Sequence, residues 1–250
     1  MYRHDSFSRT FALGLIWLNL IVIAVLSAID ALRFAGLTSY TLPRFLNISR
    51  DYSLPEVLNY GQAALCALLL AGLWNRSREP IFLAWSMVFG FVTFDDATRF
   101  HERVGLLLAE TFDLVSVAGL RTRDTGEIIA WAAVALALLL PLIRSFRQSG
   151  PQERGYGLVF LVLFACLIAF GAVLDMLQVM TSSGFVGYVE DGGEMLSIAL
   201  ACSCAVILYR GYPNGVAPAA PAGLNDGVQR SAQDHHSEVR MILRARRGIT

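Results

Sequence analysis

The sequence is poor in charge and contains no lysine. Only 16% of its 250 residues are charged, whereas soluble domains average about 25%. Its twenty basic residues, all arginine, balance twenty acidic ones, so the formal net charge is zero. So few charges cannot cover a water-facing surface, and a balanced charge gives no argument for a nucleic-acid partner. Composition therefore argues against a soluble domain and against nucleic-acid binding.

Cysteine is also scarce, and other familiar signatures are missing. Cys66, Cys166, Cys202 and Cys204 all lie in apolar runs, where a cysteine behaves as a small hydrophobic residue. On a helix, Cys202 and Cys204 point about 200° apart and cannot chelate one ion. No glycine-rich phosphate loop, Ser-His-Asp signature or haem-type histidine pair is present. We expect neither disulfides nor a cysteine metal site.

What the chain has is long apolar runs. A spanning helix needs about 20 mostly apolar residues, and six stretches qualify. The first run is longer than the apolar core of a signal peptide and lacks a small-residue cleavage site, so we expect a retained helix. The prediction is an all-α, polytopic transmembrane bundle with six spanning helices, at about 11–29, 55–74, 80 to beyond 101, 127–146, 156–180 and 189–209.

The loops suggest an orientation. Two short loops, 75–79 and 144–154, carry arginines, while the loop 181–189 carries no charge. The positive-inside rule then places the arginine loops and both termini in the cytoplasm. We expect a multi-pass protein of a bacterial inner membrane, with a transmembrane domain at 1–210. Residues 211–250, rich in proline and glycine, are expected to form a largely disordered cytoplasmic tail.

Ionisable residues inside the apolar runs are the main functional signal, because each costs a few kcal/mol in a membrane. Three sets occur, on the third, fifth and sixth predicted helices. The third and fifth helices run outward and carry their set late, whereas the sixth runs inward and carries its set early. All three sets should therefore meet near the outer face. They are Asp95, Asp96, Arg99, His101 and Glu102; Asp175 and Gln178; and Glu190, Asp191 and Glu194.

Spacing and position refine this expectation. Asp95, Arg99 and Glu102 recur at i, i+4 and i+7, which predicts a shared face of one continuous helix. Glu56 and Glu127 begin helices instead, and the runs 53–56 and 124–127 are typical of capping boxes. A structural network of salt bridges among Asp95, Arg99, Glu102 and Arg103 is an alternative use of the cluster. Carboxylates packed together need protons, arginine partners or a cation.

Two motifs resemble those of a known group. The run Asp95-Asp96-Ala97-x-x-x-His101-Glu102-Arg103 and the later Glu190-Asp191-x-x-Glu194 are similar to motifs of uncharacterised bacterial multi-pass membrane proteins. That group has Glu where this chain has Asp96 and Asp191. The resemblance covers the six-helix body and implies that these residues act together, without implying an activity.

The leading functional hypothesis is a membrane-embedded, metal-dependent hydrolase for a lipid or lipid-linked substrate. One histidine with several carboxylates is a ligand set that suits Zn, Mn or Fe, and a bound metal would activate water. The expected metal ligands are His101, Glu102, Asp175 and Glu194. Asp95 and Asp96 are the expected catalytic acids or bases, and the expected supporting residues are Arg99, Glu127, Glu190, Asp191 and Gln178.

Two other function classes stay open. A cation or proton transporter would use the same residues as a pathway, but the inner halves of the helices are almost wholly apolar, which favours a site open to one side. A non-catalytic membrane subunit or sensor would use the cluster as a structural clamp. Substrate uptake into liposomes separates transport from one-sided catalysis.

Overall fold

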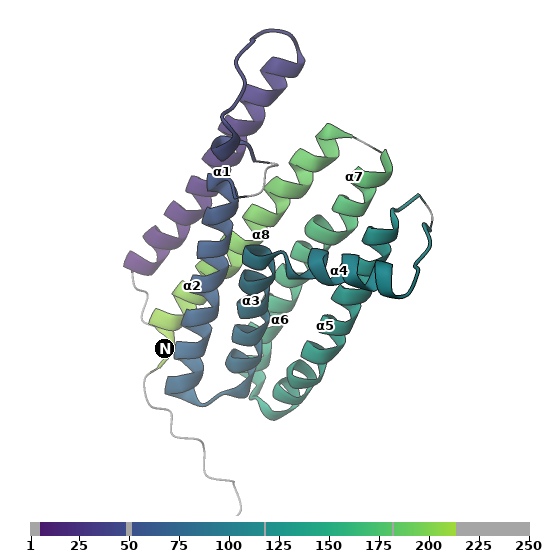
Figure 1. The fold of residues 1–250 in the computed structure, drawn as a ribbon. Helices are drawn as coiled ribbons and strands as arrows, with labels where there is room; N and C mark the ends of the chain where they lie inside the picture. Colours follow the sequence, from purple (N-terminus) through teal and green to yellow (C-terminus); the bar gives the residue numbers. More distant parts are fainter. Residues whose placement is uncertain (1–5, 49–51, 118, 182, 214–250) are drawn as a thin grey trace, which may run out of the picture. The chain divides into compact units, whose positions relative to one another are not determined.

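The computed structural model describes residues 6–48, 52–117, 119–181 and 183–213 (Figure 1). These residues form helices and turns, with no strand among them. The elements are α1 (Ser6–Phe34), the 3-10 turn η1 (Arg44–Leu46), α2 (Leu54–Ser77), α3 (Pro80–Thr98), α4 (Phe100–Thr111), α5 (Thr122–Gln148), α6 (Pro151–Ile168), the π-helical turn η2 (Ala169–Leu174), α7 (Asp175–Thr181) and α8 (Gly184–Gly211).

The six predicted membrane spans are confirmed. Six helical stretches are long and apolar enough to cross a bilayer, and α6, η2 and α7 together make one of them, Pro151–Thr181. Apart from α3, the spanning helices begin and end a few residues outside the predicted ranges, and α5 continues through Pro141. The last helix runs to Gly211, and the remainder of the predicted tail, 214–250, lies outside the described residues.

The prediction of one continuous third helix, from residue 80 to beyond residue 101, is wrong. α3 ends at Thr98, Arg99 takes a left-handed conformation with φ 53° and ψ 45°, and α4 starts at Phe100. Figure 1 shows α4 lying crosswise to α3. Asp95, Arg99 and Glu102 therefore do not share one face of a continuous helix. A left-handed residue other than glycine costs about 1–2 kcal/mol, so the surroundings must stabilise this corner.

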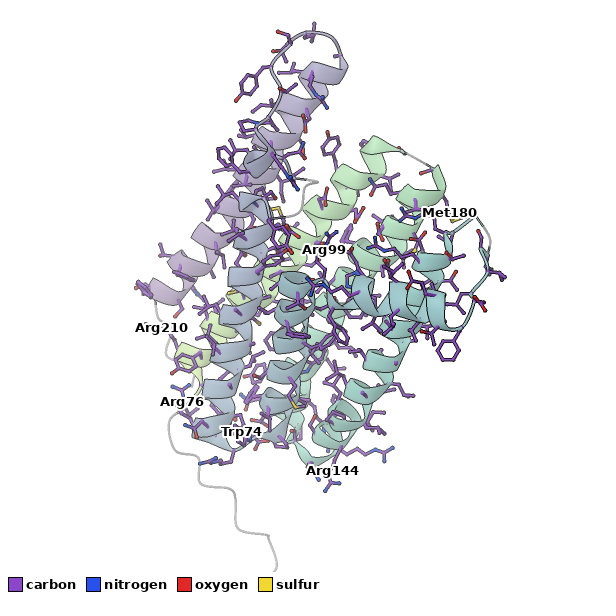
Figure 2. All side chains as sticks on the ribbon, in the orientation of Figure 1. Trp74, Arg76, Arg99, Arg144, Met180 and Arg210 are labelled. Carbon is purple, nitrogen blue, oxygen red and sulfur yellow. The ribbon has the colours of Figure 1, made fainter. Side chains whose placement is uncertain are left out.

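The end of the bundle near the α2–α3 turn is tightly packed. α2 packs against α3 and α8, and α8 also packs against α1 and α6. A cluster of buried aromatic rings fills the space, with Trp85 and Phe89 of α3 each 6.0 Å from Phe160 of α6 between ring centroids. Figure 2 shows Arg76 and Arg144 at this end and Arg99 well away from it.

Two glycines allow α4 and α5 to pack closely together. A Cβ at Gly126 would overlap the backbone carbonyl of Gly105, and a Cβ at Gly105 would overlap the backbone and side chain of Glu127. Both glycines are buried. The two helices thus approach backbone to backbone, which only glycine permits at such a distance. This contact holds the crosswise helix α4 against α5.

A buried amide pair joins α1 to α2. Asn19 Nδ2 donates to Gln62 Oε1 at 3.1 Å, and Gln62 Nε2 donates to Asn19 Oδ1 at 3.2 Å. Both side chains are almost fully buried. Interhelical hydrogen bonds of this kind hold helices together in membranes, where lipid offers the amides no alternative partner. The sequence analysis did not single out this pair, because it started from ionisable residues and added only Gln178, one turn from Asp175.

Candidate functional site

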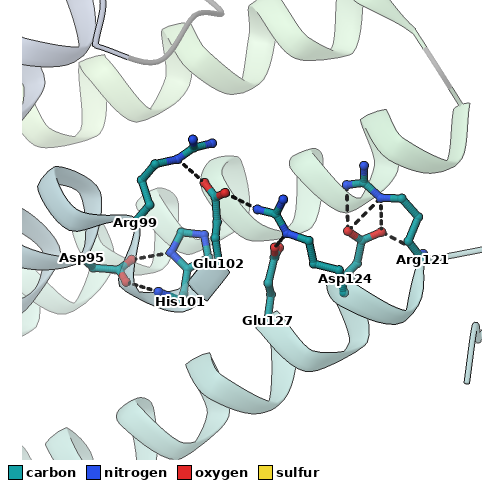
Figure 3. Close-up of polar contacts among 8 residues, drawn as sticks. Asp95, Arg99, His101, Glu102, Arg121, Asp124 and Glu127 are labelled. Carbon is teal, nitrogen blue, oxygen red and sulfur yellow. Dashed lines mark hydrogen bonds and ion pairs between the residues drawn. The ribbon is translucent and has the colours of Figure 1, made fainter. Parts of the chain in front are cut away.

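An Asp–His pair bridges the corner between α3 and α4 (Figure 3). Asp95, the last buried residue of α3, is 0% exposed. Its Oδ1 accepts the backbone N–H of His101 at 2.8 Å, and its Oδ2 lies 2.7 Å from His101 Nδ1. The carboxylate therefore satisfies an N–H in the first turn of α4, which has no partner within the helix. The same contacts orient the imidazole.

The pair also sets the charge of His101, which lies in α4 outside the six spans. Burial alone would lower the pKa of this imidazole. The hydrogen bond to Asp95 and the carboxylates of Asp95, Glu127 and Glu102 outweigh burial, so the pKa lies above the ordinary 6.5. His101 therefore holds its proton to a higher pH than a free histidine does.

A second set of polar residues forms a chain of ion pairs from α3 to α5 (Figure 3). Arg99 Nε donates to Glu102 at 2.8 Å, Arg123 pairs with the other oxygen of Glu102, and Arg123 Nε donates to Glu127 at 2.6 Å. Glu102, a predicted metal ligand, is thus held by two arginines. Glu127, a predicted supporting residue, is bound to Arg123. Of the predicted salt-bridge clamp the structure contains the Arg99–Glu102 pair, whereas the second arginine on Glu102 is Arg123 and Asp95 binds His101.

Most of the predicted residues line one polar cavity of about 330 Å³. The two exceptions are Asp95, which lies behind His101, and Glu127, which faces Arg123. Residues of α2 complete the wall. The polar lining consists of Glu56, Asn59, Tyr60, Asp96, Arg99, His101, Glu102, Asp175, Gln178, Glu190, Asp191 and Glu194.

A second, mostly apolar cavity of about 340 Å³ adjoins the first. The two share four lining residues, Asp96, His101, Gly171 and Glu194. The ring of Trp131 lines the apolar cavity, and its centroid lies 5.5 Å from that of His101. The other apolar walls come from α3, α5, α6, η2 and α8, among them Val92, Ile128, Ala135, Phe164, Leu167 and Ile198. His101 therefore lies where a polar space meets an apolar one.

The π-helical turn η2 lies at this junction. Gly171 belongs to the turn, and a Cβ there would overlap a carboxylate oxygen of Glu194 on α8. In the same way, a Cβ at Gly187 of α8 would overlap the amide of Gln178. π turns are rare and are found often at functional sites. Here the missing side chain lets Glu194 reach the shared part of the two cavities.

The two predicted capping boxes have different outcomes. Ser53 is the N-cap of α2, and its Oγ accepts the backbone N–H of Glu56 at 3.4 Å, as expected. In α5 the N-cap is Arg121, whose backbone N–H is accepted by Asp124 at 2.8 Å. Asp124 is thus the third residue of the helix and not its cap, so the capping role predicted for Glu127 is wrong. The helix starts earlier because Arg121 and Asp124 bind each other.

The predicted metal site has no ready-made ligand cluster. Among the described residues, no three His, Cys, Asp or Glu side chains are placed to share one ion. His101 Nδ1 is bound to Asp95, and Glu102 is bound to arginines. His101, Asp175 and Glu194 do line one cavity. A Zn, Mn or Fe site stays a prediction.

Several residues that line the cavities were not predicted as site residues from the sequence. Asn59 and Tyr60 are polar residues within a predicted span, and that position alone was a usable signal. Glu56 was assigned to capping and also lines the polar cavity. Trp131 gave no signal, because one aromatic residue in an apolar run is ordinary.

Comparison with protein-family models finds a match over most of the chain. The family model described as a domain of unknown function, DUF8692, matches residues 15–208, which cover part or all of each spanning helix and the residues that line both cavities. No curated protein and no solved structure matches the chain.

Proposed function

The chain belongs to the DUF8692 family, and from the geometry of its site we propose that it is a membrane-embedded hydrolase of a lipid or lipid-linked substrate. One observation carries the proposal: His101, oriented by the buried Asp95, lies at the junction of a polar and an apolar cavity. An amphipathic molecule fits such a junction, with its head group in the polar cavity and its chain in the apolar one.

In the proposed reaction His101 acts as a general base. Asp95 holds Nδ1, so the other ring nitrogen takes a proton from a water molecule, and the oxygen of that water forms a bond to the electrophilic atom of the substrate. The bond to the leaving group breaks, and the leaving group receives the proton from His101. One water is consumed and two products form. Asp95 is a positioning residue, while Asp96 and Glu194 line the space where the reaction occurs.

The packing supports a site open to one side over a transport pathway. Beyond the cavities, the space between α3, α6 and α8 is filled by buried apolar side chains, among them Phe82, Trp85, Phe89 and Phe160. A polar route through this packed aromatic core would require it to open. We further propose that the protein lies in a bacterial inner membrane, with the arginine-bearing loops and both termini in the cytoplasm.

Hydrolysis assays on the full chain in nanodiscs test the proposal. The probes are a dilauroyl phospholipid, p-nitrophenyl laurate and N-lauroylethylenediamine, an amide that carries a free ammonium group, with products identified by mass spectrometry. Removal of a general base typically costs about 10²–10⁴-fold in rate, and we expect a loss of that size for His101→Ala. For Asp95→Asn we expect a loss together with an altered pH profile, because the orientation and charge of His101 change.

Glu110→Gln is the matched control, because Glu110 is an exposed carboxylate of α4 outside both cavities. Its activity should equal that of the wild type. Failure to hydrolyse any of the three probes, or equal rates for His101→Ala and the wild type, would overturn the proposal. The metal content of the same samples, measured by elemental analysis, is a further test. Equimolar Zn, Mn or Fe that disappears in His101→Ala would make His101 a ligand and not the base.

A further inference from the structure

The polar cavity is lined by far more acidic than basic groups. Arg99 and His101 are its basic residues, and both are already bound, to Glu102 and Asp95. The ion pairs of this region leave four lining carboxylates without a basic partner among the described residues. These are Asp96, Asp175, Glu190 and Glu194. Carboxylates placed this close together must hold protons or a cation.

A buried acceptor without a donor lies in the same wall. Asn59 of α2 is 6% exposed and lines the polar cavity. Its Oδ1 has no hydrogen-bond partner in the part of the chain that the structure describes. A buried acceptor left unbound is destabilising, so a ligand that brings a donor recovers this energy. This observation is independent of the carboxylates, and it too favours a ligand whose head group donates hydrogen bonds.

The adjoining apolar cavity limits the rest of the ligand. Its volume of about 340 Å³ lies near the lower end of the range for small-molecule sites, and its walls are mainly aliphatic and aromatic. That space suits one hydrocarbon chain better than two. A phosphate head group, by contrast, would face carboxylates of the same charge, and Arg99, the arginine among the described lining residues, is already bound to Glu102.

We propose that the ligand of these two cavities is a single-chain lipid amine, with its ammonium group among Asp96, Glu194 and Asn59 and its chain beside Trp131. The idea rests on the proposed function and refines it, since it names the substrate class as single-chain lipids that carry an ammonium group together with the ester or amide bond to be hydrolysed. The ammonium supplies both the positive charge that the carboxylates require and the donor that Asn59 Oδ1 lacks.

Binding of three matched probes tests this. Hexadecylamine, hexadecanol and hexadecyl phosphate share a chain and differ in the head group. Each is added to the full chain in nanodiscs of a zwitterionic lipid, and tryptophan fluorescence is followed. Trp131 lines the apolar cavity, so the signal should disappear in Trp131→Phe. We expect the amine to bind at least about tenfold more tightly than the phosphate, which is the value of one charged hydrogen bond.

Variants of the polar wall make the test specific. Asn59→Leu and Glu194→Gln should each weaken amine binding about tenfold by loss of an acceptor or a charge, whereas Glu110→Gln should leave it unchanged. Two different positions are used so that a folding defect in one variant does not decide the result. Equal or tighter binding of the phosphate, or amine binding unaffected by both variants, would overturn the inference.

The outcomes also separate this inference from the proposed hydrolase. Tight, variant-sensitive amine binding without hydrolysis of any probe would leave the amine site standing and remove the hydrolase. Hydrolysis that depends on His101, together with equal binding of all three probes, would support the hydrolase and remove the amine preference.

Discussion

The two ends of the bundle are built on different principles. Near the α2–α3 turn the helices are regular, and large side chains such as Phe82 and Phe160 are fully buried. At the other end, α3 breaks at Arg99, the span that begins with α6 widens into the π turn η2, and two cavities remain.

The difference follows from the chemistry of the side chains. In a membrane, irregular backbone is tolerated only where protein or a water-filled cavity satisfies its polar groups. Both irregularities lie beside carboxylates: Asp95 satisfies the start of α4, and Glu194 lies against Gly171. The packed end therefore stabilises the fold, whereas holding polar groups in place at the end with the cavities lowers the overall stability.

The largest effect should come from the packed end. Phe160→Ala removes a ring that is 0% exposed and touches Trp85 and Phe89. We expect the free energy of unfolding to fall by about 3 kcal/mol, the lower end for such a change, because an unfolded state in lipid keeps the transfer contribution small. Unfolding in SDS measures it. The control Phe185→Ala removes an exposed ring and should change little, so equal losses would contradict the comparison.

A smaller but distinct effect should come from the polar end. Gly126→Ala places a methyl group on the carbonyl of Gly105, and neither backbone can move without separating α4 from α5. Overpacking of this kind costs about 1–3 kcal/mol. Gly61→Ala in α2 is the control, since a Cβ there meets nothing within 4 Å, and it should stabilise slightly. If both variants unfold alike, the backbone contact is unimportant.

The amide pair between α1 and α2 should contribute less. Gln62→Leu breaks both hydrogen bonds to Asn19, and hydrogen bonds between membrane helices average about 0.6 kcal/mol with a maximum near 1.7. The double variant Asn19→Leu, Gln62→Leu should recover part of the loss, because no amide is then left unpaired. A double-mutant cycle of SDS unfolding tests this. Purely additive losses would show that the two amides are not coupled.

The smallest effect we expect is a pH dependence from His101. Because its pKa is raised in the folded protein, its contribution to stability is complete below about pH 6.5 and is lost as the pH rises through the folded value. The difference in melting temperature between the wild type and His101→Gln should therefore shrink from about pH 6 to about pH 9. A difference that grows over this range would contradict the raised pKa. The charged groups that act on His101 or line a cavity with it are Asp95, Glu127, Glu56, Asp96, Arg99, Glu102, Asp175, Glu190, Asp191 and Glu194.

The spans were readable from the sequence because apolar runs of spanning length have few other uses. The sequence also predicted that the three polar sets lie near the same end of the bundle. The reason is that successive spans run in opposite directions, and each span carries its polar residues at the end that faces the same side. The break at Arg99 was not readable. No glycine or proline marks it, and it exists because Asp95, folded back onto α4, stabilises a conformation that arginine rarely adopts.

The sequence by itself determined that this protein lies in a membrane and that its charged residues gather near one end, because both follow from apolar length and helix direction. Only the tertiary structure decided which charges serve which purpose. Arg123 of α5 binds Glu102 of α4, whereas Asp96 of α3 and Glu194 of α8 line the same two cavities. Such partners lie far apart along the chain, and no local pattern encodes which of them will touch.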